Sequence, residues 1–368
     1  MSAIRVSLIT NIPAPYRVPV FDRLAAMPDI DLTVIYAART EPDRSWDLPA
    51  LNHPHRFLRE RIHRTRKHRF IHNNPDVFPL LRSLSPDVVV TGGFNPTHLY
   101  GFAYAKLFAR KHVAMTDGTI RSEAELGGIH RFARHAVFAR SAAFVAASRA
   151  SRALMVARGA PESKIFLSPL CANASVAWTS AGAMLRNFDL LFSGRLVTVK
   201  NPLFAMEVAV GIADKLGRRV SLAMLGDGPL EAALRLRASE IRDRVEVTLA
   251  GNVAQVDLPH WFGSARLFLF PTSWDPWGVV ANEACTAGLP TIISPHAGAA
   301  GELIVDGRNG HVRDLDVGQW VTASVNILTD PERHMLFSKE AVRRVQPYNF
   351  ESAAQGIATA ARYAVTAH

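Results

Sequence analysis

The chain has only two cysteines, Cys171 and Cys285, among its 368 residues. They lack the spacing of a paired motif and are too few for a disulfide framework, so the sequence favours a reducing compartment. No stretch approaches the roughly 20 apolar residues of a membrane span, and the first residues lack a basic start followed by a long apolar run. These absences predict a cytoplasmic protein.

Acidic residues are also scarce relative to basic ones. The 42 Lys and Arg residues outnumber the 32 Asp and Glu residues, which gives a net charge of +10. Between His53 and His72 only Glu60 opposes a run of basic residues, namely Arg56, Arg59, Arg61, Arg64, Arg66, Lys67 and Arg69. This segment predicts peripheral contact with an anionic membrane or an acidic acceptor, or else a solvated loop. Aromatic residues that could stack on bases are few here, so no nucleic acid is expected.

A second group of basic residues lies on one predicted helix. Arg131, Arg134 and Arg140 fall within the helix expected over His130–Arg140. They could extend a basic face, or they could be ordinary solvated side chains.

A hydrophobic content of 48% with 20% charged residues describes a well-packed globular protein, and the length suits two domains. Short apolar runs alternate with helical periodicity, which predicts α/β domains with doubly wound parallel sheets. We place the first domain at 1–170, a linker at 171–187, the second domain at 188–345, and a C-terminal helix, packing back toward the first domain, at 346–368. Two such domains facing each other would leave a ligand cleft at the carboxyl ends of both sheets.

The prediction of two α/β domains depends mainly on the expected strands. In the first half we expect them at Ile4–Thr10, Leu32–Ala37, Val88–Thr91, Val113–Met115, Ala143–Ala146 and Ile165–Leu167. In the second half we expect them at Asp189–Ser193, Val220–Leu225, Val245–Leu249, Leu267–Leu269 and Thr291–Ile293. Each is a short apolar run, as in strands that are buried on both faces.

The most informative segment has the sequence DPWGVVANE and runs from Asp275 to Glu283. Its two carboxylates stand eight residues apart, across a Trp-Gly turn that leads into a helix. Such acids can accept hydrogen bonds from sugar and ribose hydroxyls, while amides around Val279 and Val280 face a phosphate. The alternative is an ordinary helix start, with Asp275 as the cap and Pro276 in the first helical position.

Two further loops follow predicted strands of the second domain. Arg195 and Lys200 lie five residues apart before a helix that begins at Pro202, an arrangement that suits a diphosphate. Gly226 and Gly228 would let the backbone approach a ligand closely, or would simply form a tight turn. Two exposed basic residues in a loop are the alternative for the first pair.

Together these motifs resemble the retaining GT-B-fold glycosyltransferases of family 4, over nearly the whole chain and most strongly from Leu191 to Gly310. The residues that carry the resemblance are Gly194-Arg195-Leu196 with Lys200, Gly226-Asp227-Gly228, Gly251-Asn252-Val253, and the acid pair Asp275 and Glu283.

The resemblance implies a role for each motif. Arg195 and Lys200 would hold the donor diphosphate, Asp275 would touch the donor sugar, and Glu283 would accept the ribose hydroxyls. Asn252 would lie beside the nucleobase. Backbone amides would line the sugar-phosphate pocket, and they belong to Trp277, Gly278, Val279 and Val280.

Two departures from the family pattern affect the catalytic detail. The first acid of the pair is Asp275, where the family has glutamate. A histidine that the family often places in the first domain is absent, and Thr116-Asp117-Gly118-Thr119 stands there instead. Asp117 is therefore a candidate for a polar role toward the donor sugar or the acceptor.

The sequence thus predicts transfer of a sugar, with retention of configuration, from a nucleoside-diphosphate sugar to a glycan or lipid-linked acceptor in cell-surface polysaccharide or glycolipid synthesis. We expect no cofactor and no metal ion, and a cytoplasmic protein at the inner face of the membrane. One alternative is a catalytically weak, nucleotide-binding subunit of a glycan-assembly complex. Another is a sugar-nucleotide epimerase on the same architecture.

Overall fold

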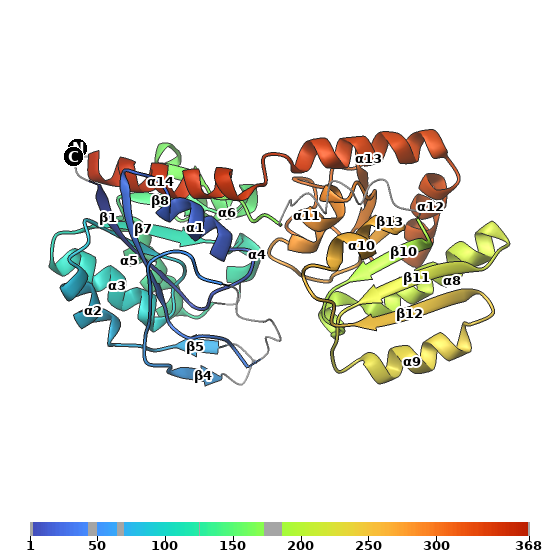
Figure 1. Cartoon of the computed structure of the whole chain (residues 1–368), viewed down its shortest axis with the longest axis horizontal. Coiled ribbons are helices and arrows are strands. Elements are labelled where there is room, and N and C mark those ends of the chain that lie inside the picture. Colours follow the sequence, from blue (N-terminus) through green and yellow to red (C-terminus); the bar gives the residue numbers. More distant parts are fainter. Residues whose placement is uncertain (1–2, 43–49, 65–69, 125, 173–185, 367–368) are drawn as a thin grey trace. The chain divides into compact units, whose positions relative to one another are not determined.

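Parallel sheets organise both halves of the chain (Figure 1). The computed structural model describes residues 3–42, 50–64, 70–124, 126–172 and 186–366. The chain divides into a first unit, residues 1–171 with 350–368, and a second unit, residues 172–349.

The first unit is built on a seven-stranded sheet in the order β3-β2-β1-β6-β7-β8-β9, all parallel. Its strands are β1 Ile4–Thr10, β2 Ile30–Tyr36, β3 His55–Phe57, β6 Val88–Thr91, β7 Lys111–Thr116, β8 Ala143–Ala146 and β9 Ile165–Leu167. Its helices are α1 Val18–Ala25, α2 Val77–Leu84, α3 Pro96–Leu107, α4 Ile120–Glu123, α5 Gly128–Arg140 and α6 Arg149–Ala157, with the short 3₁₀ turn Glu162–Lys164. A separate two-stranded antiparallel sheet pairs β4, Ile62–Arg64, with β5, Phe70–His72.

The order of this sheet reverses between β1 and β6. The chain adds β2 and β3 on one side of β1 and all later strands on the other side, beginning with β6. Helices therefore leave the two central strands in opposite directions, and a crevice opens at their carboxyl ends. Open α/β sheets bind ligands at such a position.

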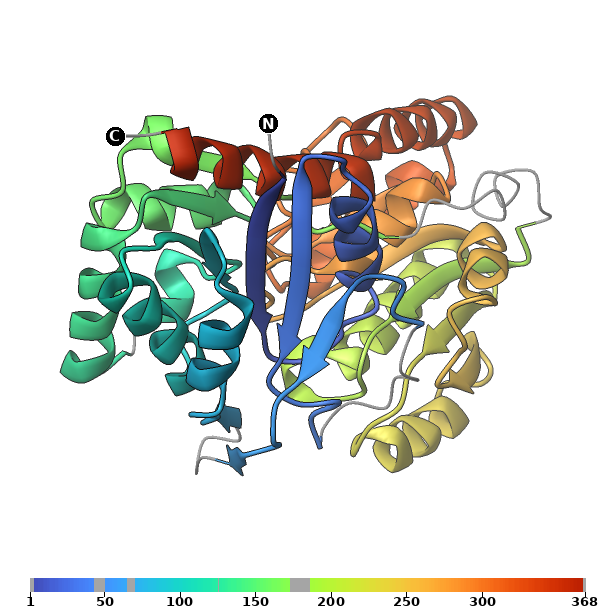
Figure 2. The same ribbon diagram turned by 60° about the vertical axis from the view of Figure 1, so that its left-hand side comes forward.

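The last helix, α14 (Phe350–Thr366), packs on the first sheet (Figure 1). Figure 2 shows it in red, crossing the dark blue strands. A Cβ atom added at Gly356 would lie 1.8 Å from the Leu167 carbonyl oxygen, so glycine allows the helix to approach β9 closely. Arg362 closes the contact with an ion pair of 2.7 Å to Asp29. The chain thus returns to the first unit after completing the second.

The second unit is built on a six-stranded parallel sheet in the order β12-β11-β10-β13-β14-β15. Its strands are β10 Phe188–Ser193, β11 Val220–Leu225, β12 Val245–Gly251, β13 Ala265–Phe270, β14 Thr291–Ile293 and β15 Gly310–Val312. Its helices are α8 Pro202–Leu216, α9 Glu231–Glu240, α10 Leu258–Gly263, α11 Val279–Thr286, α12 Val317–Leu328 and α13 Pro331–Val345, with the 3₁₀ turn Thr198–Lys200. Apolar residues of β10, β11 and β13 pack with α8 and α12 around Trp320. This sheet reverses its order between β10 and β13.

The basic segment of the first unit is more structured than a plain solvated loop. Its start forms the edge strand β3, and its middle forms β4. Four of its arginines are exposed, namely Arg56, Arg59, Arg61 and Arg64. Arg66, Lys67 and Arg69 lie outside the described residues, as does most of the expected linker at 171–187.

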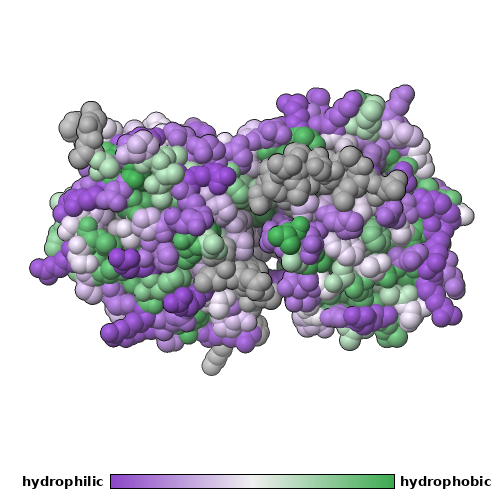
Figure 3. Space-filling view, in the orientation of Figure 1, coloured by the Kyte–Doolittle hydropathy of each residue, from purple (hydrophilic) through white to green (hydrophobic). Residues whose placement is uncertain are grey.

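The surface in Figure 3 is mainly hydrophilic, with smaller hydrophobic areas between. Within the described part of the chain, none of the helices has the length and apolar character needed to cross a bilayer.

Candidate functional site

Two loops meet where the second sheet reverses its order. One follows β10 and the other follows β13, and the two strands are neighbours in the sheet. The Val199 carbonyl oxygen accepts hydrogen bonds from the Ser273 amide at 2.8 Å and the Thr272 hydroxyl at 3.0 Å. The Asn201 side chain donates to the Pro271 carbonyl oxygen at 2.8 Å. These bonds fix the two loops side by side, although they are far apart in sequence.

Lys200 and Asp275 face each other across this junction. The Lys200 ammonium donates a hydrogen bond to Oδ2 of Asp275 and forms an ion pair with it. The two side chains are 16% and 17% exposed, so the pair is largely shielded from water. Because an ammonium has three donors, Lys200 can hold Asp275 and still reach an anion. The structure therefore brings together two residues that the sequence placed in one site.

Asp275 does not cap the following helix, so that alternative for the segment is wrong. Oδ1 of Asp275 accepts from the Trp277 amide at 3.0 Å, and α11 begins only at Val279, after Gly278. Gly278 has a φ of +92°, and a Cβ atom there would lie 2.3 Å from the ring of Phe270. The turn delays the helix start because only glycine fits against this ring.

The segment offers backbone rather than an aromatic ring to a ligand. The Trp277 ring is 1% exposed, stacks on Tyr348 with centroids 5.5 Å apart, and donates from Nε1 to Asn282 at 2.8 Å. The Trp277 amide is used within the loop by Asp275. The amides of Val279 and Val280 lie in the first turn of α11, where helical geometry provides no carbonyl partner. Of the four amides expected to line a phosphate, these two are best placed.

The predicted glycine loops pack against each other at neighbouring strand ends. Gly194 donates to the Leu225 carbonyl oxygen at 3.0 Å, and Gly226 donates to that of Gly251 at 2.7 Å. A Cβ atom at Gly226 would lie 2.1 Å from the Gly194 oxygen, and one at Gly228 would lie 2.6 Å from the Leu196 oxygen. The tight-turn alternative therefore accounts for both glycines.

Arg195 and Asn252 are exposed on these loops. Arg195 follows Gly194 directly, and Asn252 follows Gly251 at the end of β12. The loops after β10, β11 and β12 thus line one edge of the sheet, because the strands are parallel.

Glu283 is buried in the second turn of α11. Only 8% of the residue is exposed, and burial raises the pKa of its carboxyl group to about 8, since an ionised carboxylate loses its hydration there. A buried carboxyl group with a raised pKa marks a candidate binding position for hydroxyl groups.

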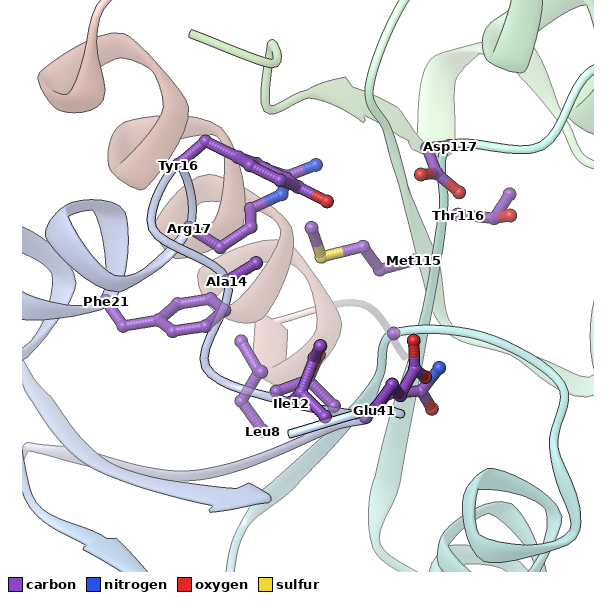
Figure 4. A pocket seen from close by; sticks show the side chains of 13 residues that line it. Leu8, Ile12, Ala14, Tyr16, Arg17, Phe21, Glu41, Met115, Thr116 and Asp117 are labelled. Carbon is purple, nitrogen blue, oxygen red and sulfur yellow. The ribbon is translucent and has the colours of Figure 1, made fainter. Parts of the chain in front are cut away.

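The first unit has a pocket of about 200 Å³ at its own reversal point. Its lining includes residues that follow β1, β6 and β7. Figure 4 shows Tyr16 and Arg17 along one side, Thr116 and Asp117 across from them, and Glu41 at the lower end. Asp117, predicted for a polar role, is exposed and belongs to this pocket.

Arg17 and Glu41 were missed by the sequence analysis. Arg17 donates to the Ser168 hydroxyl at 3.2 Å, and burial lowers its pKa. Oε1 of Glu41 accepts from Nε2 of His72 at 2.8 Å, and both residues are buried. Arg17 stood in an Asn-Ile-Pro-Ala-Pro-Tyr-Arg run that could have indicated a turn at the end of β1. Nothing around Glu41 indicated its partner, which is 31 residues away.

Residues 182–344 match the family described as Glycosyl transferases group 1. This match lies within the second unit, residues 172–349, and covers most of it. Over 181 residues the chain is 29% identical to the D-inositol 3-phosphate glycosyltransferase of Streptomyces coelicolor, a match that covers 45% of this chain and 38% of the relative.

Two other similarities extend this finding. A GDP-mannose-dependent alpha-(1-6)-phosphatidylinositol monomannoside mannosyltransferase of Mycolicibacterium smegmatis is 29% identical over 143 residues, 36% of this chain and 37% of the relative. The match to this chain thus spans well under half the length of both curated relatives. The structure of Anabaena HepE in complex with UDP and glucose has a TM-score of 0.70 at 16% identity and covers 97% of this chain and 98% of its own. The fold class is accordingly GT-B, with two Rossmann-like units.

The raised pKa of Glu283 predicts a pH-dependent stability. The folded protein holds the Glu283 proton up to a pH of about 8, whereas the unfolded chain releases it near 4.5. The contribution of this residue to stability is therefore present below 4.5 and is lost as the pH rises toward about 8. Replacing it by the neutral isostere, Glu283→Gln, should remove that loss.

We expect the unfolding temperature of Glu283→Gln to rise above that of the unchanged protein, by roughly 2–4 °C for each kcal/mol, as the pH increases across this window. Thermal unfolding measured from the acid to the alkaline end of the window checks this. Glu332→Gln, an exposed residue of α13, is the matched control and should give no such trend. A difference in unfolding temperature between Glu283→Gln and the unchanged protein that is the same at all pH values would contradict the raised pKa of Glu283.

Proposed function

We propose that the protein transfers a sugar from a nucleoside-diphosphate sugar to a glycan or lipid-linked acceptor, with retention of anomeric configuration. The observation that carries the proposal is the Lys200–Asp275 pair, which lies at the reversal point of the second sheet beside the start of α11. A cation and free helix amides at such a point suit a diphosphate.

The donor would occupy the edge formed by the loops of the second unit. Lys200 and Arg195 would hold the diphosphate, and the Val279 and Val280 amides would face its sugar-linked phosphate. Glu283 would accept the ribose hydroxyls, Asp275 would touch the donor sugar, and the exposed Asn252 would border the base. As the bond to the sugar breaks, negative charge grows on the departing diphosphate, and fixed positive groups stabilise it without reorganising.

The acceptor would enter the pocket of the first unit. Asp117 and Glu41 offer carboxylate oxygens to acceptor hydroxyl groups, and Arg17 and Tyr16 offer donors. His72 would orient Glu41 through their hydrogen bond. A lipid-linked acceptor would place the reaction in cell-surface polysaccharide or glycolipid synthesis at the inner face of the membrane, with the exposed arginines of the basic segment toward anionic lipid.

The donor nucleotide is UDP or GDP in this proposal. Anabaena HepE was solved with UDP and glucose, and the Mycolicibacterium relative is described as GDP-mannose-dependent. Both donor classes carry the diphosphate that Lys200 would bind, so both belong in the first test.

The test is a thermal-shift screen of nucleoside diphosphates and their sugars, followed by transfer assays with the donor that binds. A ligand at 100 times its dissociation constant should stabilise the protein by about 2.7 kcal/mol. Lys200→Met should weaken binding by roughly 10-fold to 100-fold, because a hydrogen bond to a charged group contributes about 1.5–3 kcal/mol. Lys215→Met, at an exposed lysine of α8, is the matched control and should bind normally.

The outcomes separate the competing functions. Binding with transfer to an acceptor supports the proposal. Binding without any turnover would indicate a nucleotide-binding partner subunit, and a changed sugar without acceptor would indicate an epimerase. Equal binding by Lys200→Met and the unchanged protein would reject the site.

We also propose that transfer needs no resident divalent ion. The charge of the diphosphate would be met by Lys200, Arg195 and the first amides of α11. We therefore expect EDTA to leave the initial rate of transfer unchanged, measured with metal-free donor and acceptor. A rate that falls in EDTA and returns on adding magnesium or manganese would refute this.

A further inference from the structure

Helix α5 carries two large apolar side chains on the side that faces away from the sheet. Ile129 is 85% exposed and Phe132 is 73% exposed. Ala136 and Ala139 continue the same stripe, since spacings of three and four residues return to one face of a helix. Single exposed apolar residues are common on protein surfaces, but two large ones on adjacent turns of one helix form a patch.

The helix is held firmly by its other face. Val137 and Phe138 are buried, and the Phe138 ring stacks on Phe144 of β8 with centroids 5.5 Å apart. Arg134 forms an ion pair of 2.6 Å with Glu123, whose side chain is only 4% exposed. The buried contacts of Val137, Phe138 and Arg134 thus fix which residues of α5 point outward.

Glu123 joins three elements of the first unit. Besides Arg134 it binds Arg158 at 2.9 Å, so it ties α5 and α4 to the end of α6. The Arg134 guanidinium also lies 4.4 Å from the ring centroid of Phe94. The sequence suggested that Arg134 could belong to a basic face, but its side chain instead packs against Glu123 and Phe94.

Positive charge borders the apolar stripe. Arg131 and Arg140 are exposed on α5, and the segment 126–140 contains no acidic residue. On the preceding helix α4, Ile120 is 58% exposed and is followed by the exposed Arg121. A helix with an outward apolar stripe and basic flanks is typical of segments that lie in the interface of an anionic bilayer.

We propose that the outer face of α5, with Ile129 and Phe132 at its centre, inserts into the surface of an anionic lipid bilayer. Its arginines then meet the lipid headgroups, while the two apolar side chains enter the acyl boundary. The proposal deepens the function above and rests on it for the acceptor: α4 begins three residues after Asp117, so the face and the acceptor pocket share one connection. An acceptor carried in the bilayer would be presented to that pocket.

Vesicle flotation of the full chain tests the insertion. The probes are phosphatidylcholine vesicles with and without phosphatidylglycerol. We expect the unchanged protein to bind the anionic vesicles and to be partly released by salt, because salt screens the headgroup attraction. The double variant Ile129→Gln with Phe132→Gln should bind at least about tenfold more weakly, because it removes two large apolar side chains from the insertion.

A matched control and a fold check complete the design. Leu236→Gln changes a side chain of α9 that is 64% exposed, and this variant should bind vesicles like the unchanged protein. The double variant should keep the unfolding temperature and the nucleotide-induced thermal shift of the unchanged protein. Arg131→Gln with Arg140→Gln should weaken binding to the anionic vesicles only.

Two results would overturn the inference: failure of the unchanged protein to bind anionic vesicles, or equal binding by the double variant. Vesicle binding and nucleotide binding are measured separately. A protein that binds vesicles through α5 but shows no nucleoside-diphosphate shift would reject the proposed transferase and keep the membrane contact.

Discussion

The ion pair between Lys200 and Asp275 sets the arrangement of the loops that we propose as the donor-binding edge of the second unit. It joins the loops after two neighbouring strands, and both charges are largely shielded from water. Removing one partner would leave the other shielded and uncompensated, which is strongly destabilising for buried pairs. Asp275 also accepts a hydrogen bond from the Trp277 amide. The turn that this bond closes, together with Gly278, determines that α11 begins at Val279. The first free amides of that helix therefore occupy a position that depends on the pair.

The same constraint explains why aspartate suits this position. One oxygen of Asp275 reaches Lys200 and the other reaches an amide two residues along its own loop. A glutamate would carry the carboxylate one methylene further from that loop. Buried acids elsewhere are stabilised differently: Glu41 accepts a hydrogen bond from His72, whereas the Glu283 carboxyl group retains its proton to a higher pH. Both units thus keep reactive polar groups at the reversal points of their sheets.

Much of this fold could be predicted from the sequence, because buried parallel strands are short runs of apolar residues. Val88–Thr91 and Ala143–Ala146 form strands with the predicted bounds. The edge strands β3 and β15 were missed. β3 has the sequence His-Arg-Phe and β15 has the sequence Gly-His-Val, so neither is an apolar run. The sequence also brought Lys200 and Asp275 into one site. The sequence could not show that Asp275 fails to cap α11, because the position of the helix start depends on the ring of Phe270 beside Gly278. It could not reveal Glu41 either, because the hydrogen-bond partner of Glu41 is a histidine far away in the sequence.

The central claim is that Asp275 positions the Lys200 ammonium to bind a diphosphate. A double-mutant cycle with Lys200→Met and Asp275→Asn, read by calorimetric affinity for the nucleoside diphosphate that binds the unchanged protein, tests it most directly. The account predicts that Asp275→Asn lowers the affinity when Lys200 is present and does not lower it in the Lys200→Met background. An affinity that rises on Asp275→Asn with Lys200 in place, or losses that simply add, would contradict it.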